Sequence, residues 1–161
     1  MFNKLNLSFC AYRLLWGCLF ALVLGWTTTT MAASEDVDAL VSASVGGDNK
    51  KVQALLKKGV DANTMGTGGV TALMEAALGG HRDVAELLLA HGADANTMNS
   101  DGATALMAAT MNGHLEVVKL LLGKGADVNT KSPSGISALN LATYQGQKEV
   151  AELLKRLGAK E

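Results

Sequence analysis

A fixed period of 33 residues is the feature that most constrains how this chain of 161 residues can fold. A Gly-x-Asp-x-Asn motif begins at Gly59, Gly92 and Gly125, each 33 positions after the last, and a partial copy begins at Gly158. A period of this length is typical of stacked repeats, in which each unit buries its apolar face against the next. We therefore expect four repeats. Their predicted limits are about 36–66, 67–99, 100–132 and 133–161.

Each repeat contains the signals of two short helices. Thr71 and its equivalent Thr104 can cap the first helix by accepting a backbone N–H, and Gly80 can end it in a left-handed conformation. The second helix carries an apolar stripe that includes Leu88, and it ends near Gly92. These signals predict an all-α solenoid of four helix–turn–helix units with short hairpin-like turns. The two end copies are expected to act as caps.

The motifs resemble those of the ankyrin repeat family over about residues 36–161. The family's Thr-Pro-Leu-His motif corresponds to Thr71-Ala72-Leu73-Met74 and to Thr104-Ala105-Leu106-Met107. Its Gly-His, triple-leucine and Gly-Ala-Asp-x-Asn motifs are found as Gly80-His81, Leu87-Leu88-Leu89 and Gly92-Ala93-Asp94-Ala95-Asn96. Alanine replaces the proline and methionine replaces the histidine in both central copies. The resemblance implies an ankyrin-repeat solenoid with somewhat softer turns, and a role in protein–protein interaction.

Residues 1–33 have the pattern of a cleaved secretory signal peptide. Lys4 and Arg13 precede an apolar run over residues 14–26, and small residues follow that run. We expect cleavage after one of residues 32–34. The mature protein is then predicted to be periplasmic or secreted.

Two alternatives to a cleaved signal peptide start from the same leader. An uncleaved membrane anchor needs roughly 20 apolar residues, and this run is shorter. A lipoprotein signal would use Cys18, but Trp16 is bulky for that motif and the apolar run continues past the cysteine. The cleaved signal peptide is the interpretation that we favour.

Charge and cysteine content narrow the classes of function. The chain has 14 basic and 15 acidic residues, a net charge of -1, so it lacks the basic footprint of a nucleic-acid-binding protein. Cleavage removes Lys4 and Arg13 and leaves 12 basic residues against 15 acidic ones, a net charge of about -3. A chain with this net charge is not attracted to an anionic membrane. Cys10 and Cys18 both lie in the leader, so the cleaved chain has no thiol for a disulfide, a metal or catalysis.

No group of residues in the repeats predicts catalysis, a cofactor or a metal centre. His81 and His114 occupy the same slot in adjacent repeats, about 10 Å apart, so we expect both to be structural. His91 stands at a helix end, where a partly positive imidazole suits the dipole. Asp94 recurs with the period and is explained by turn geometry. The glycine-rich segment 66–69 lacks the Lys-Ser/Thr of a phosphate-binding loop.

The methionines leave a metal carrier open as an alternative. Thioether sulfurs bind Cu(I). Five of the seven methionines of the chain lie in the repeats, at Met65, Met74, Met98, Met107 and Met111. Met74 and Met107 face the core by the period, so we interpret the set as gap-filling residues and an adaptable contact surface.

One slot of the first helix is apolar in all four repeats, at Val45, Leu78, Met111 and Tyr144. By the family resemblance this slot lies on a concave face, where Asn112 and Gln145 would be its neighbours. A row of this kind suits a protein-binding surface, with Tyr144 as its anchor. Alternatively, these side chains lean on neighbouring helices and complete the core. The residues predicted to bind a protein are Val45, Met65, Leu78, Met98, Asp101, Met111, Asn112, Lys131, Tyr144 and Gln145.

The sequence thus predicts an exported, monomeric module that binds another protein and has no enzymatic activity, no cofactor and no nucleic-acid or membrane partner. An inhibitor or immunity-type protein that blocks a partner enzyme is an alternative within the same class. A small periplasmic metal carrier or enzyme is the alternative from a different class.

Overall fold

Helix pairs make up the part of the chain that the computed structural model describes, residues 35–160. The first helix of the first pair covers residues 35–45 within that range. The helices that follow are α2 Asn49–Lys58, α3 Ala72–Gly79, α4 Arg82–Ala90, α5 Ala105–Met111, α6 Leu115–Gly123, α7 Ala138–Tyr144 and α8 Lys148–Arg156. A short 3-10 turn, η1, covers Thr67–Gly69. The all-α solenoid expected from the period is therefore confirmed.

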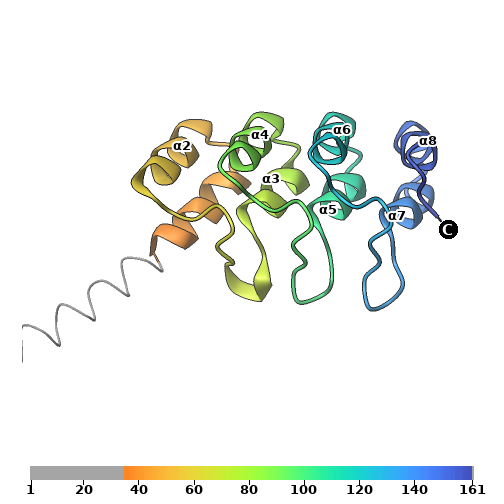
Figure 1. Cartoon of the computed structure of the whole chain (residues 1–161), viewed down its shortest axis with the longest axis horizontal. Coiled ribbons are helices and arrows are strands. Elements are labelled where there is room, and N and C mark those ends of the chain that lie inside the picture. The colour runs from red at the N-terminus through yellow and green to blue at the C-terminus, as the bar shows by residue number, and fades with distance from the viewer. Residues whose placement is uncertain (1–34, 161) are drawn as a thin grey trace, which may run out of the picture. The chain divides into compact units, whose positions relative to one another are not determined.

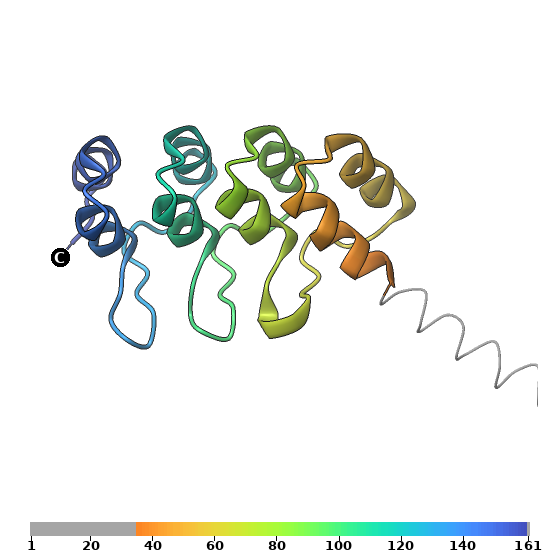
Figure 2. The ribbon, with the colours of Figure 1, turned by 180° about the vertical axis from the view of Figure 1, so that it is seen from behind.

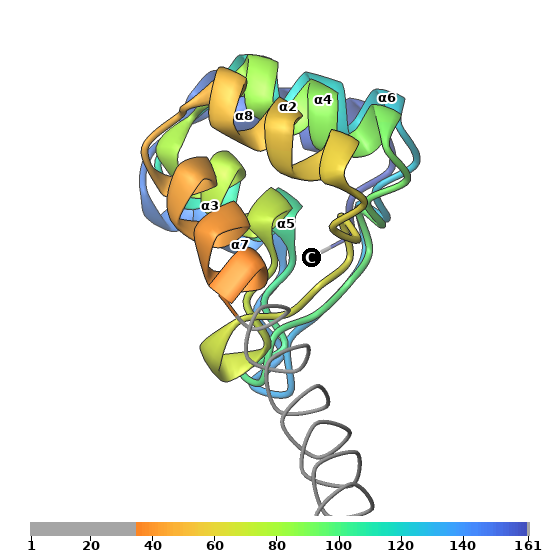
Figure 3. The same cartoon turned by 90° about the vertical axis from the view of Figure 1, so that its left-hand side faces the viewer.

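The helices of residues 36–160 stand in two rows (Figure 1). We call residues 35–45, α3, α5 and α7 the inner helices, and α2, α4, α6 and α8 the outer helices. Figure 2 shows the same pairs from behind, in sequence order along the stack. An end-on view shows the loops between pairs projecting away from the outer helices, beyond the inner ones (Figure 3). We call these loops, at residues 64–70, 97–103 and 130–136, the fingers.

Side-chain caps begin the inner helices where the sequence predicts them. Thr71 Oγ1 accepts a hydrogen bond from the Met74 N–H at 3.3 Å, and Thr104 Oγ1 accepts one from Met107 at the same distance. Ser137 caps α7 in the same way, within a reciprocal capping box that the sequence analysis did not identify. The predicted ends are also confirmed for α3, whose cap Gly80 has a φ of 73°.

The core lies between the two rows. Alanines at the centre of the inner helices, such as Ala76 and Ala109, are fully buried, and their small size lets consecutive helices approach closely. The outer helices contribute larger side chains, among them Leu88 and Leu121, which are also fully buried. Met74 and Met107 belong to this core, as the sequence analysis expected.

None of the helices within residues 35–160 combines the length and apolar character that a membrane crossing needs. The leader, with its predicted signal peptide and Cys18, lies outside the described residues.

Candidate functional site

The fingers are hairpins held by their own backbone. The amide of Gly66 donates to the carbonyl of Val70 at 2.9 Å, Asn99 donates to Ala103 at 3.0 Å, and Ser132 donates to Ile136 at 2.9 Å. Side chains close the second and third fingers further. In the second finger, Asn99 Oδ1 accepts hydrogen bonds from the backbone amides of Asp101 and Ala103. In the third finger, Ser132 Oγ accepts one from the amide of Ile136. These contacts confirm the hairpin-like turns.

Consecutive fingers also contact each other. The amide and hydroxyl of Ser100 both donate to the carbonyl of Gly68, at 3.0 and 2.5 Å. Gly102 lies against Pro133 of the next finger so closely that a Cβ at this position would collide with the proline ring, and its φ is 74°. The fingers therefore form a continuous wall beside the inner helices.

A ladder of hydrogen bonds joins the far ends of the inner helices. His81 Nε2 hydrogen-bonds the Val45 carbonyl at 2.9 Å, and His114 Nε2 hydrogen-bonds the Leu78 carbonyl at 3.0 Å. Gln147 takes the same position in the last repeat and donates to the Met111 carbonyl at 3.3 Å. The two histidines thus have the structural role that we expected, and they fix the backbone of the apolar row.

A second ladder runs along the turns after the outer helices. The Asn96 side-chain amide donates to the Gly125 carbonyl at 3.1 Å, and its Oδ1 accepts from the Asp127 amide at 2.7 Å. Asn63 makes the equivalent pair of bonds to the repeat that follows it. Asp94 Oδ1 accepts from the Asn96 amide at 2.9 Å, so the recurrent aspartates shape turns. Both ladders hold the repeats in one register and leave the surface between them open.

The apolar row on the inner helices faces solvent at three of its four positions. Val45 is 53% exposed, Met111 43% and Tyr144 87%, whereas Leu78 is half-buried. This arrangement favours the surface interpretation of the row over the alternative in which it completes the core. The row runs parallel to the wall of fingers.

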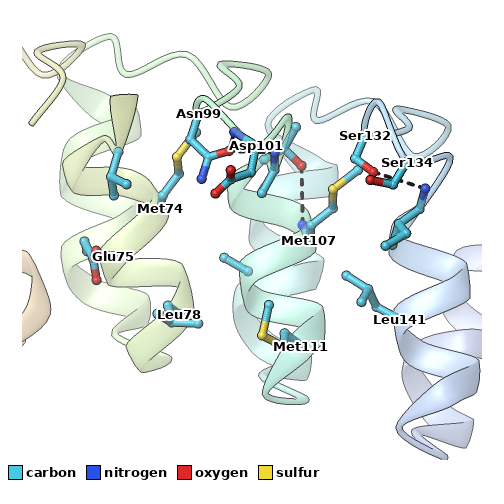
Figure 4. Close-up of a pocket in the computed structure, with 15 residues that line it drawn as sticks. Met74, Glu75, Leu78, Asn99, Asp101, Met107, Met111, Ser132, Ser134 and Leu141 are labelled. Atoms are coloured by element: carbon cyan, nitrogen blue, oxygen red, sulfur yellow. Dashed lines mark hydrogen bonds between the residues drawn. The ribbon is translucent and has the colours of Figure 1, made fainter. Parts of the chain in front are cut away.

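Two hollows lie between the inner helices and the fingers, and together they define what we call the groove. The more apolar one, of about 370 Å³, spans α3, α5 and α7, and we call it the central hollow (Figure 4). Ala108 lines it on α5. Leu78, Met111 and Asp101 from the predicted set line it as well. The second hollow, of about 400 Å³, lies beside residues 35–45 and includes Val45 and Val70.

The remaining predicted residues stand outside both hollows. Met65 and Met98 are exposed on the fingers, at 55% and 47%, and Tyr144 and Gln145 are exposed at the end of α7. Lys131 is exposed on the third finger. Asn112 donates its side-chain amide to the Leu78 carbonyl at 2.8 Å, so it ties α5 to α3.

A second row, at Glu75, Ala108 and Leu141, was not among the residues predicted from the sequence; it lies three residues before the apolar row. All three residues line the central hollow. Reading the sequence at the same 33-residue step would have identified these three positions. The small side chain of Ala108 lies between the larger side chains of Glu75 and Leu141, and this size pattern indicates a depression in the surface. Figure 4 shows Glu75 on α3 and Leu141 on α7, with Asp101 above them on the second finger.

Metal-ligating groups do not gather within residues 35–160, where no three His, Cys, Asp or Glu side chains form a cluster that could hold an ion. Met74 and Met107 are buried beneath the second and third fingers (Figure 4).

Comparison with known proteins agrees with the geometry. A family model described as ankyrin repeats (3 copies) matches residues 12–99, 40–132 and 89–160. A search of curated proteins finds no match to the chain.

Proposed function

The chain belongs to the ankyrin repeat family, and on this premise we propose that it is an exported module that binds one protein partner in the groove. Ankyrin repeats are generally protein–protein interaction modules, and solenoids of this type offer extended concave surfaces to their partners. Proteins of this family typically have no enzymatic activity. We propose that this chain also has no enzymatic activity. It would act as a monomer, through shape and apolar contact alone.

The observation that carries the proposal is the exposed apolar row beside the hollows. Val45, Met111 and Tyr144 keep large apolar surface in water although the ladders of hydrogen bonds fix the backbone around them. Apolar patches of this kind are typical of surfaces that another protein covers. Tyr144 is the natural anchor, because a tyrosine loses little entropy on binding and can also form a hydrogen bond.

Export is a proposal that the leader supports through its basic start, its apolar run over residues 14–26 and the small residues after it. Mass spectrometry of the protein recovered from the producing cells tests it. A chain that begins at one of residues 33–35, found in the periplasm or the medium, would support export. A full-length chain in the cytoplasm would contradict it.

Site-specific photo-crosslinking tests the groove as the binding site. A photoreactive phenylalanine analogue replaces Tyr144 in one variant and Ala90, which is exposed on the outer helix α4, in the control. We expect a crosslinked adduct with one protein species from position 144 and none from position 90. Equal adducts from both positions, or adducts from position 90 alone, would contradict binding in the groove.

The double variant Tyr144→Ala, Met111→Ala tests the same surface without a probe. We expect it to keep the helical circular dichroism of the wild type, because both side chains are exposed. Pull-down of the partner identified by crosslinking should fall by roughly tenfold or more, as for a residue that anchors an interface. A loss of helicity instead would show that the row belongs to the core.

A further inference from the structure

The charges of the molecule are divided unevenly between its two faces. Within residues 35–160, Lys131 is the one basic residue on the inner helices and fingers, and every other lysine and arginine lies on the outer helices or on the turns next to them. The inner helices and fingers carry five acidic residues, which are Glu35, Asp36, Asp38, Glu75 and Asp101. The surface beside the groove is therefore acidic, although the whole chain is nearly neutral.

The carboxylates at the groove have no partner of their own. Asp38, Glu75 and Asp101 each line a hollow, and their side chains make no hydrogen bond or ion pair among the described residues. By contrast, Arg82 pairs with Glu86 at 3.2 Å and Lys119 with Glu116 at 2.8 Å on the outer helices. Asp36, which lies outside both hollows, pairs with Lys58 at 2.6 Å.

Glu75 holds the central position. It lines both hollows, and it is half-buried beside apolar neighbours such as Leu78. Asp101 faces the same space from the second finger (Figure 4). A cation beside Glu75 would be partly shielded from water, because this side chain is half-buried, so the attraction would exceed that of a pair on an open surface.

We propose that the groove takes a basic, amphipathic segment of the partner protein. Its apolar side chains lie over Leu78, Ala108 and Met111, and neighbouring lysine or arginine side chains reach Glu75 and Asp101. The inference rests on the proposed function, and it adds the chemistry of the partner. Positive charge on the partner also speeds association and excludes acidic competitors.

A second copy of the chain fits this description less well. The basic residues of α2, such as Lys50, Lys51 and Lys57, could face the acidic groove, but α2 has no large exposed apolar side chain to fill the hollows. A self-complex through α2 would therefore satisfy the charge of the groove and leave its apolar floor uncovered.

Selection from a random 12-residue peptide display library tests the proposal on protein purified from cells that express the full chain. We expect the selected peptides to be enriched in lysine and arginine next to aliphatic or aromatic residues. Their affinity should fall as NaCl rises from about 50 to 300 mM, because salt screens exposed charge pairs. The double variant Glu75→Gln, Asp101→Asn should bind them roughly 3- to 30-fold more weakly.

Charge reversal and a steric block complete the experiment. Glu75→Lys should shift the selected peptides toward acidic sequences, whereas Glu152→Lys on the outer helix α8 should not. Ala108→Phe should fill the central hollow and abolish peptide binding, whereas Ala54→Phe, exposed on α2, should leave peptide binding unchanged. Circular dichroism of each variant confirms that it is folded.

The outcomes separate this inference from the proposed function. Peptides that Ala108→Phe blocks but that carry no excess of basic residues would overturn the basic partner and leave binding in the groove standing. Peptides that bind the Ala108→Phe variant as well as the wild type, or the absence of any enriched peptide, would count against both. Light scattering that shows a dimer dissolved by Glu75→Lys would identify a second copy as the occupant and overturn the proposal.

Discussion

The outer helices α4 and α6 have ion pairs within one helix, whereas Glu75 on the inner helix α3 and Asp101 on the second finger are unpaired beside apolar side chains. Arg82 and Glu86 are four residues apart on α4, at the spacing that lets side chains meet on a helix surface. On the other face, Glu75 has no ion pair among the described residues and Met111 is 43% exposed. The two faces are built from the same repeat, so the difference arises from side chains that the shared core does not determine.

This difference shows which positions of a repeat are constrained by folding alone. The outer face has exposed charged side chains, some of them in ion pairs within one helix. The groove has an exposed apolar row and carboxylates that find no matching groups among the described residues. Three experiments test the comparison, from the largest expected effect to the smallest.

Leu121→Ala should have the largest effect on stability, because both faces depend on the core between them. Leu121 is fully buried on α6, and its truncation leaves a cavity that costs about 2–5 kcal/mol of the free energy of unfolding. Tyr144→Ala, at 87% exposure, should change that free energy by about 0.5 kcal/mol or less. Urea unfolding followed by circular dichroism measures both. Similar losses in the two variants would mean that the groove face is core.

Asn96→Ala should have an intermediate effect. The substitution removes two hydrogen bonds that tie the second repeat to the third, and it leaves the Asp127 amide without its partner. We expect a loss of about 1–3 kcal/mol. Asn112→Ala, which removes one such bond, is the matched comparison and should lose less. The order of the two unfolding midpoints checks this expectation, and a reversed order would contradict it.

Lys119→Ala should have the smallest effect, confined to the titration of one carboxyl group. The hydrogen bond and the charge of Lys119 hold the pKa of Glu116 below its ordinary value. A carboxyl group whose pKa is lowered in the folded state stabilises the protein at pH values above the ordinary pKa of that group. That stabilisation is lost as the pH falls through the lowered one. NMR titration should show the Glu116 pKa rising in the variant. An unchanged Glu116 value would show that the pair is absent in solution.

The period was sufficient to predict the helices and their caps. Thr71 and Thr104 recur at the spacing that the fold needs, and the burial of Met74 and Met107 followed from the same period. These features depend on contacts that are local or that repeat in every unit. Sequence spacing alone therefore determines them.

The partners across repeats could not be predicted in this way. The sequence assigned a structural slot to His81 but not its acceptor, the carbonyl of Val45 in the preceding repeat, because that depends on the stagger between helices. Asn112 was expected at the binding surface, and the structure shows that it holds α5 to α3. The hollow around Ala108 was missed because a small residue on a helix is ordinary until its neighbours are placed in space.

The exposure of Tyr144 also provides a native spectroscopic reporter. It is the only aromatic residue after position 26 of the chain, so the emission of a leaderless protein excited near 275 nm would come from this one phenol. Quenching or a change in anisotropy when another polypeptide covers the last repeat could then be followed without attaching a dye.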